Sequence, residues 1–378
     1  MFVRPKKPTP EPHVRRTLNE LGYEFDVGSG KLVNMATIAV YEYEQPGASK
    51  KQNKELYESL IHPASRHVYS IITGNDLQMQ PIAVPDARQP HCNIYATPGA
   101  LEKKHLVVII TGHGTFAAVW GWNVLVKSGL NVGSVIGYIR SCVQRGFGVL
   151  LLNPNENIVA PDGCSETFNS YNGQSTSING SETPNEHVGF VWTHIIRSSA
   201  AKSVVFVSYS SSSIAIIDLL KYDYARFAKK VACVAFIDST HSTFLLRSGA
   251  VTWLKQAARH WETSTETSDE LLFDKHTGCS TVLVKNDSGI RELTPSLCMD
   301  NLLDYIADSF KRGPIADIPE MSPGELLADR AVDTGAFDSS SSDSDLEDNA
   351  VLGSVDNVQV VNTIGDVQQS SDGYIGWC

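Results

Sequence analysis

The sequence predicts an α/β protein whose core is a doubly wound, mostly parallel β-sheet, followed by an acidic C-terminal tail. Continuous apolar runs, typical of strands buried on both faces, alternate with segments whose apolar residues recur at helical spacing. Several of these runs end in polar residues, and one ends in a row of serines. Because functional residues of doubly wound sheets gather at the carboxyl ends of the strands, these endings form the candidate site.

The serine-rich ending is the most informative stretch. The apolar run 204–207 enters Ser208–Ser213, and apolar residues then recur at helical spacing from Ile214 to Leu220. A strand that turns abruptly into a helix at a serine is the geometry of a nucleophile elbow, usually written G-x-S-x-G. Here Ser210 is the corner residue, and Ser208 and Ser212 replace the glycines. The alternative is an ordinary turn whose serines cap helix N–H groups.

The other elements follow from the same patterns. Before the serine corner, the sequence predicts short strands within 18–33, a helix over 54–72 interrupted at Pro63, strands at 106–110 and 149–152, and a helix over 132–145 with Gly146 as C-cap. A polar run over 160–183 predicts a long surface loop, and Thr183-Pro184 opens a further helix. After the corner come strands at 231–237 and 280–284 and a closing helix over 302–310.

These elements divide the chain into four parts. Residues 1–16 form a disordered basic lead, and 17–86 form an N-terminal extension that packs on the main domain. Residues 87–312 form the α/β domain, and 313–378 form a disordered acidic tail.

The net charge of −11 belongs to the tail. From Pro314 onwards the chain has 13 acidic residues against Arg330 alone, so the remainder is close to neutral and carries no bias towards nucleic-acid binding. Within 338–348, Ser340, Ser342 and Ser344 each have an acidic residue three positions downstream, as acid-directed kinases prefer. We expect either multisite phosphorylation there or a merely solubilising acidic segment.

Several classes of protein are excluded. Seven scattered cysteines without a C-x-x-C pair argue against a disulfide framework and a zinc site, and most are expected to be buried. No metal-ligand spacing, phosphate loop or dinucleotide fingerprint is present, so neither a metal nor a cofactor is expected. A secretory signal and an apolar stretch of membrane-spanning length are also missing. The sequence thus predicts a nuclear or cytoplasmic protein without a membrane partner.

For acyl transfer the polar strand ends have defined roles. Ser210 would attack, His241 would take its proton, and Asp238 would orient the histidine. The backbone N–H of Ser211, with one from the Gly112-His113-Gly114 loop, would hold the oxyanion.

The histidine is the missing part of this triad. His241 lies only three residues after Asp238, and the loop after the last strand, 285–294, has no histidine. His113, His260 and His276 remain open alternatives. The polar run 153–157 is either a site element or a turn. Without a base a serine hydroxyl is a poor nucleophile, so the sequence favours a scaffold over an enzyme.

Several blocks resemble the Arb domain of Argonaute-binding proteins and their animal relatives, the cotranscriptional regulators. They are 146–149 running into Asn153-Pro154-Asn155-Glu156-Asn157, the run 186–194, the corner at Ser210, and Asp238-Ser239-Thr240-His241. The start of the extension, 18–25, is similar as well, so the resemblance covers about 17–310.

The resemblance implies an α/β-hydrolase-like fold and a role in Argonaute-linked RNA silencing, chromatin or splicing regulation, with Argonaute, chromatin or splicing proteins as partners. The family's serine maps to Ser210. Relatives carry a histidine just before Glu-Leu-Thr, where this chain has Arg291, and glycines where it has Ser212 and Ser213. A non-catalytic scaffold is therefore the leading hypothesis, and a serine hydrolase using Ser210, Asp238 and His241 on an ester or other acyl group is the alternative.

Overall fold

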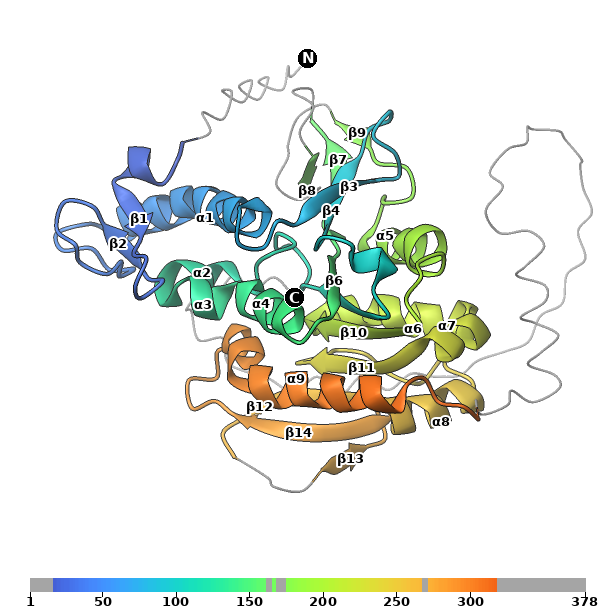
Figure 1. Ribbon diagram of the computed structural model, residues 1–378. Coiled ribbons are helices and arrows are strands. Elements are labelled where there is room, and N and C mark those ends of the chain that lie inside the picture. The colour runs from blue at the N-terminus through green and yellow to red at the C-terminus, as the bar shows by residue number, and fades with distance from the viewer. Residues whose placement is uncertain (1–15, 161–164, 168–174, 267–270, 318–378) are drawn as a thin grey trace, which may run out of the picture.

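The computed structural model describes residues 16–160, 165–167, 175–266 and 271–317 (Figure 1). The predicted basic lead, except for its last residue, and the acidic tail after Asp317 lie outside these ranges, as do Ser340, Ser342 and Ser344.

A nine-stranded sheet organises the described chain, as the sequence predicts. Its order is β13-β14-β12-β11-β10-β5-β6-β4-β3. The strands from β6 to β14 in this order run parallel, whereas β3, β4 and β13 pair antiparallel at the two edges. Their bounds are β3 Gln80–Val84, β4 Cys92–Ala96, β5 His105–Ile110, β6 Gly148–Leu151, β10 Ser203–Tyr209, β11 Val231–Ile237, β12 Ala258–Ser264, β13 Leu272–Asp274 and β14 Cys279–Lys285. This is an α/β-hydrolase-like fold.

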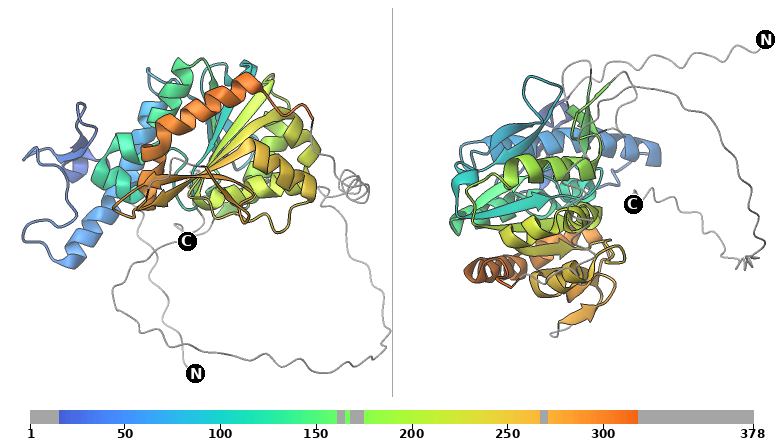
Figure 2. Two further views of the ribbon diagram at one scale, coloured as in Figure 1. Left: turned by 90° about the horizontal axis from the view of Figure 1, so that it is seen from below. Right: turned by 90° about the vertical axis from the view of Figure 1, so that its right-hand side faces the viewer.

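Helices cover both faces of this sheet (Figures 1 and 2). One face packs against α1 Lys50–Thr73, α2 Trp122–Ser128, α4 Ile136–Gln144 and α9 Thr294–Arg312. The other packs against α5 Pro184–Val191, α6 Ser213–Tyr222, α7 Tyr224–Lys230 and α8 Ser248–Ala257. Successive residues of β10 alternate between the two cores, Val205 facing the first and Phe206 the second. Burial on both faces explains why the parallel strands read as unbroken apolar runs.

The N-terminal segment packs on the sheet rather than folding apart. The short helix η1 Asn19–Leu21 and the hairpin β1 Tyr23–Phe25 and β2 Leu32–Asn34 share the first core with α1. Strand β3 lies before residue 87, so the sheet begins inside the segment predicted as an extension.

Three local predictions are wrong. Helix α1 continues through Pro63, which is buried, because packing of its neighbours Leu60 and Ala64 in the first core outweighs the lost hydrogen bond. The helix expected over 132–145 is divided at Ser134, which pairs with Val119, into α3 Leu130–Gly133 and α4.

The third concerns the long loop expected over 160–183. Its described parts carry β8 Ser165–Thr167 and β9 Thr176–Ser177, which pair on both sides of β7 Glu156–Val159.

Five cysteines in the described part of the chain are buried in the core, as the sequence predicts for most of them. Cys92, Cys142, Cys233, Cys279 and Cys298 are free and buried, and burial raises the pKa of each thiol to about 12. No helix in the described part of the chain is both long and apolar enough to cross a bilayer.

Candidate active site

The serine corner has the backbone geometry of a nucleophile elbow. Strand β10 is buried throughout and ends at Tyr209, and the short helix η5 Ser210–Ser212 leads directly into α6. Ser210 has φ 57°, in the left-handed region that a non-glycine residue enters at a cost in free energy. Its hydroxyl makes no hydrogen bond to any residue the structure describes, so the strained position presents an unengaged side chain.

The neighbouring serines fix the turn from inside. Ser212 donates to the Tyr209 carbonyl at 2.8 Å, and Ser213 donates to the Ser210 carbonyl at 2.7 Å. These hydroxyls donate to carbonyl oxygens and accept no helix N–H, so the alternative of N-terminal capping is wrong. Serine therefore substitutes for the usual small glycines while adding bonds that glycine lacks.

The loop after β5, which contains Gly112, lies against this corner. A Cβ on Gly112 would stand 3.2 Å from the Tyr209 ring and 3.5 Å from the Ser210 Cβ, so the close approach depends on glycine. Asn155 holds this loop in place, since its Nδ2 donates to the carbonyls of Gly112 at 2.8 Å and Thr115 at 2.9 Å.

His113 extends from this loop to Ser211, which lies in η5. Its Nδ1 lies 2.6 Å from the Ser211 Oγ, so the histidine pairs with the serine after Ser210. Burial lowers the pKa of His113, which favours the neutral imidazole. The crevice between His113, Asn155 and Ser212 has no room for a water molecule.

The Asn153–Asn157 run, left open as a site element or a turn, is a polar brace under the site. The backbone N–H of Asn153 donates to His187 Nε2 at 3.3 Å, and Asn157 Nδ2 donates to the Ser181 carbonyl at 2.7 Å. His187 has no exposed surface, and burial lowers its pKa to about 3. The sequence did not single out His187 as part of this network.

Asp238 follows β11 at the same edge, also in the left-handed region with φ 41°. Its Oδ1 accepts the backbone N–H of Thr263 at 2.7 Å, and its Oδ2 accepts the Thr263 hydroxyl at 2.8 Å. The side chain is 5% exposed. The carboxylate therefore joins β11 to β12, and no histidine of the described chain donates to it.

His241 has both ring nitrogen atoms engaged elsewhere. Nε2 lies 2.9 Å from the Thr277 carbonyl, to which it must donate, so Nδ1 accepts from the Ser239 hydroxyl. The ring stacks on Phe236 and is 2% exposed, and burial lowers its pKa to about 4. The structure thus does not join His241 to Asp238.

The remaining candidate histidines contribute no base. His260 is buried, accepts the Ser239 N–H at 3.0 Å and has its pKa lowered to about 4, mainly by burial. His276 is exposed on the turn between β13 and β14. After β14 the short helix η6 Arg291–Leu293 packs Glu292 against Gly121, where a Cβ would meet the Glu292 Cγ at 2.5 Å.

The structure therefore brings Ser210, Ser211, Gly112 and His113 together. Asp238 and His241 instead make separate hydrogen bonds, Asp238 with Thr263 and His241 with Ser239 and Thr277. Among the described residues, no group of three or more His, Cys, Asp and Glu side chains is arranged to hold a metal ion.

Known proteins resemble this chain over most of its length. The Arb2 domain matches residues 14–268. The cotranscriptional regulator ARB2A of Mus musculus is 25% identical over 350 residues, covering 80% of this chain and 83% of the relative. Its homolog in Dictyostelium discoideum is 24% identical over 322 residues, covering 79% and 81%.

Solved structures give weaker likenesses. A histone deacetylase from Saccharomyces cerevisiae aligns with a TM-score of 0.44 at 14% identity, covering 68% of this chain and 98% of that chain. A bacterial heroin esterase aligns with a TM-score of 0.36 at 10% identity, covering 70% and 92%. The Arb2 match extends over more than half of the chain and includes the elbow, the brace and the Asp238 block, so this chain belongs to the Arb2 domain family.

Proposed function

We propose that this chain is a cotranscriptional regulator that uses its α/β-hydrolase-like body as a protein-binding scaffold. Its relatives carry that description, and the resemblance of its motifs to Argonaute-binding proteins extends the proposal to Argonaute-linked RNA silencing, chromatin or splicing regulation. The partners are Argonaute, chromatin or splicing proteins, met in the nucleus or the cytoplasm.

One observation supports a scaffold above all. The two residues that would activate Ser210 are committed to structural bonds: Asp238 to Thr263, and His241 to Ser239 and Thr277. A serine without a base and an orienting carboxylate lacks the proton acceptor that nucleophilic catalysis requires. What remains at the sheet edge is a rigid, hydrogen-bonded surface rather than a working triad.

The test is capture of partners by the tagged full-length chain from cells in which it is naturally expressed, at moderate salt, with identification by mass spectrometry. Argonaute, chromatin or splicing proteins are expected, and Ser210→Ala is expected to capture the same set because the scaffold does not use the hydroxyl. Repeated capture of none of these classes would end the proposal.

A serine hydrolase acting on an ester or other acyl group remains the second candidate, favoured by one feature. Ser210 keeps the left-handed backbone of an elbow and an unengaged hydroxyl, while His113 lies on the adjacent loop with a lowered pKa. Fluorophosphonate treatment, read by intact mass, separates the two functions. An adduct that disappears in Ser210→Ala but persists in Ser211→Ala supports the hydrolase, and the absence of any adduct on folded protein supports the scaffold.

A further inference from the structure

Basic side chains gather at the edge of the sheet opposite the candidate active site. Parallel strands all begin at one edge, so the segments that lead into β5, β6, β10 and β11 come together there. Each of these segments carries an exposed lysine or arginine within three residues of its strand. Together with the end of α9 they form what we call the amino-edge basic face: Lys103, Lys104, Arg145, Lys202, Lys229, Lys311 and Arg312.

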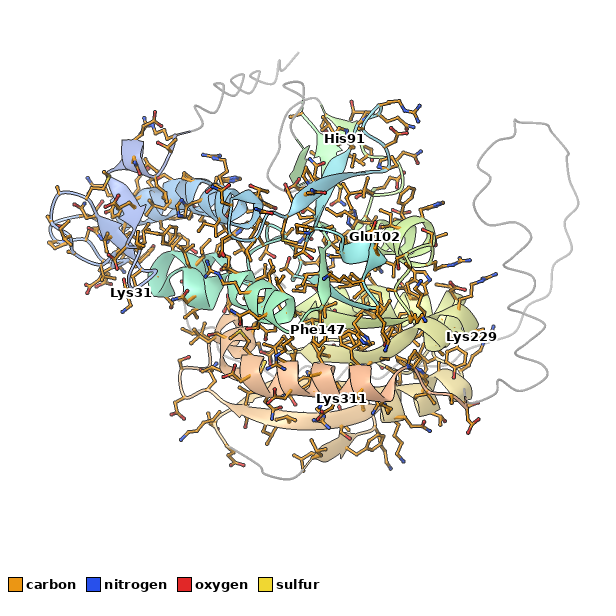
Figure 3. The ribbon with its side chains drawn as sticks, in the orientation of Figure 1. Lys31, His91, Glu102, Phe147, Lys229 and Lys311 are labelled. Carbon is orange, nitrogen blue, oxygen red and sulfur yellow. The ribbon has the colours of Figure 1, made fainter. Side chains whose placement is uncertain are left out.

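Helix α9 closes this face by running back along the sheet. Arg312 donates to the Ala232 carbonyl at the start of β11 at 3.2 Å, and Arg145 donates to the Leu303 carbonyl at 2.9 Å. These contacts place the last turn of α9 beside the entrances to β6 and β11. Figure 3 labels Phe147, Lys229 and Lys311 along this edge, away from Lys31 on the N-terminal hairpin.

The face has an excess of positive charge. Three carboxylates lie within it, of which Asp304 pairs with Arg145 at 3.0 Å and Asp308 pairs with Lys311 at 2.9 Å; the third is Glu102. By contrast, no carboxylate in the described part of the chain lies within salt-bridge distance of four members, namely Lys103, Lys104, Lys202 and Lys229. The body as a whole is close to neutral, so this excess is local.

A cavity of about 670 Å³ opens within the face. Its apolar wall is aromatic, with the Phe147 and Phe310 rings 4.7 Å apart and His105 4.6 Å from Phe310. Lys104, Arg145 and Lys311 stand at its rim together with one carboxylate, Asp304, so the charged side chains that line the cavity have a net positive charge. An apolar wall with a cationic rim fits an acidic peptide that carries an apolar side chain.

We propose that the acidic segment 338–348 of the same chain docks on this face, with Leu346 in the cavity. The segment has five acidic residues, no basic residue, and Leu346 between Asp345 and Glu347. It begins 26 residues after Arg312, at the end of the helix that lines the cavity. A linker of that length can span at most roughly 90 Å, so it is long enough for the segment to reach the face.

Tethering favours this occupant over a nucleic acid. A segment held by such a linker has an effective concentration of about 1 mM at its own binding site. A nucleic acid would have to displace this attached polyanion before its phosphates reached the lysines. The interaction is electrostatic and exposed at its rim, so it weakens when salt shortens the screening length.

The test compares lysine acetylation rates, read by mass spectrometry, in two full-length variants with equal charge changes. The docking variant carries Asp343→Asn, Asp345→Asn, Glu347→Gln and Asp348→Asn. The matched control carries Asp333→Asn, Asp356→Asn, Asp366→Asn and Asp372→Asn outside the segment. At low salt, Lys104 and Lys311 are expected to react roughly fivefold faster in the docking variant than in the original chain and the control, whereas Lys31 is unchanged.

Zero-length carbodiimide cross-linking of the original chain locates the contact. Cross-links from 338–348 to Lys104 or Lys311, formed within one molecule in an equal mixture of ¹⁴N- and ¹⁵N-labelled protein, support the proposal. Three results overturn it. The first is equal lysine rates in the two variants. The second is cross-links of which half join a ¹⁴N chain to a ¹⁵N chain, the proportion that contact between molecules gives in an equal mixture. The third is protection of Lys104 by an RNA oligonucleotide that is identical with and without the four docking changes. The last result would assign the face to nucleic acid.

Discussion

Ser210 and Asp238 stand at two strand ends on the same edge of the sheet and share the same kind of backbone strain, but their side chains have opposite roles. Ser210 after β10 and Asp238 after β11 both have positive φ, at 57° and 41°. The hydroxyl of Ser210 makes no hydrogen bond within the described chain, whereas the carboxylate of Asp238 accepts two bonds from Thr263. Strain at Ser210 displays a side chain, and strain at Asp238 is offset by a buried link between strands. Backbone geometry alone therefore does not identify a catalytic residue.

The largest expected effect is a dependence of the free energy of unfolding on pH, which distinguishes the Asp238 strand end from the Ser210 strand end. Burial lowers the folded-state pKa of both His241 and His260 to about 4, against about 6.5 when unfolded. The unfolded chain thus binds protons more readily below pH 6.5, so their contribution to stability is present above 6.5 and is lost as the pH falls towards 4. Together they reduce the free energy of unfolding by about 3 kcal/mol between pH 6.5 and 5.

Urea denaturation between pH 6.5 and 5 measures this slope, that is, how steeply the free energy of unfolding changes with pH. Buried His187 adds to it in every variant. His260→Gln is expected to flatten the slope strongly, and His113→Gln on the elbow side is expected to flatten it less, because the His113 side chain is more exposed and burial lowers its pKa less. Equal flattening by both variants would contradict the distinction.

Removing the Asp238 carboxylate comes next. Asp238→Ala leaves the partly buried Thr263 N–H without its acceptor and is expected to cost about 3 kcal/mol in the free energy of unfolding. Asp238→Asn keeps one acceptor oxygen and tolerates positive φ, so about 1 kcal/mol is expected. Chemical denaturation of both variants tests this, and equal losses would show that charge rather than hydrogen bonding is decisive.

Loosening the brace under the elbow has a smaller effect. Asn155→Ala frees the carbonyls of Gly112 and Thr115 and is expected to cost about 1–2 kcal/mol. Hydrogen exchange over 111–116 is expected to accelerate, because the loop loses its attachment to the chain after β6. Asn157→Ala, whose bonds go to Pro154 and Ser181, is the control that leaves this loop protected.

The smallest effect measures the strain at the elbow itself. Ser210→Ala removes no hydrogen bond and is expected to change stability by less than about 0.5 kcal/mol. Ser210→Gly removes the Cβ at positive φ and is expected to be about 1 kcal/mol more stable than Ser210→Ala. At Ser211, where φ is not positive, glycine is expected to be less stable than alanine; the same order at both positions would argue against strain at Ser210.

The sequence by itself determined the features that depend on neighbouring residues. Apolar runs predicted β5, β6, β10, β11 and β14 because strands buried on both faces carry no polar alternation. The serine corner predicted the elbow, and Thr183 with Pro184 predicted the start of α5, where the Thr183 hydroxyl accepts the Glu186 N–H at 3.2 Å. The motif blocks predicted the Arb2 family before any three-dimensional comparison.

Only the tertiary structure decided which side chains meet. Strand β12 mixes buried and polar residues, and its position in the sheet depends on pairing with β11 and β14. Asp238 lies three residues before His241 and was predicted to orient that histidine. In the structure its carboxylate instead accepts two hydrogen bonds from Thr263 on the next strand. His113 met Ser211, and lysines from residue 103 to residue 311 met at one edge. These contacts join residues far apart in the chain, and no local pattern encodes them, because they depend on how strands and helices pack.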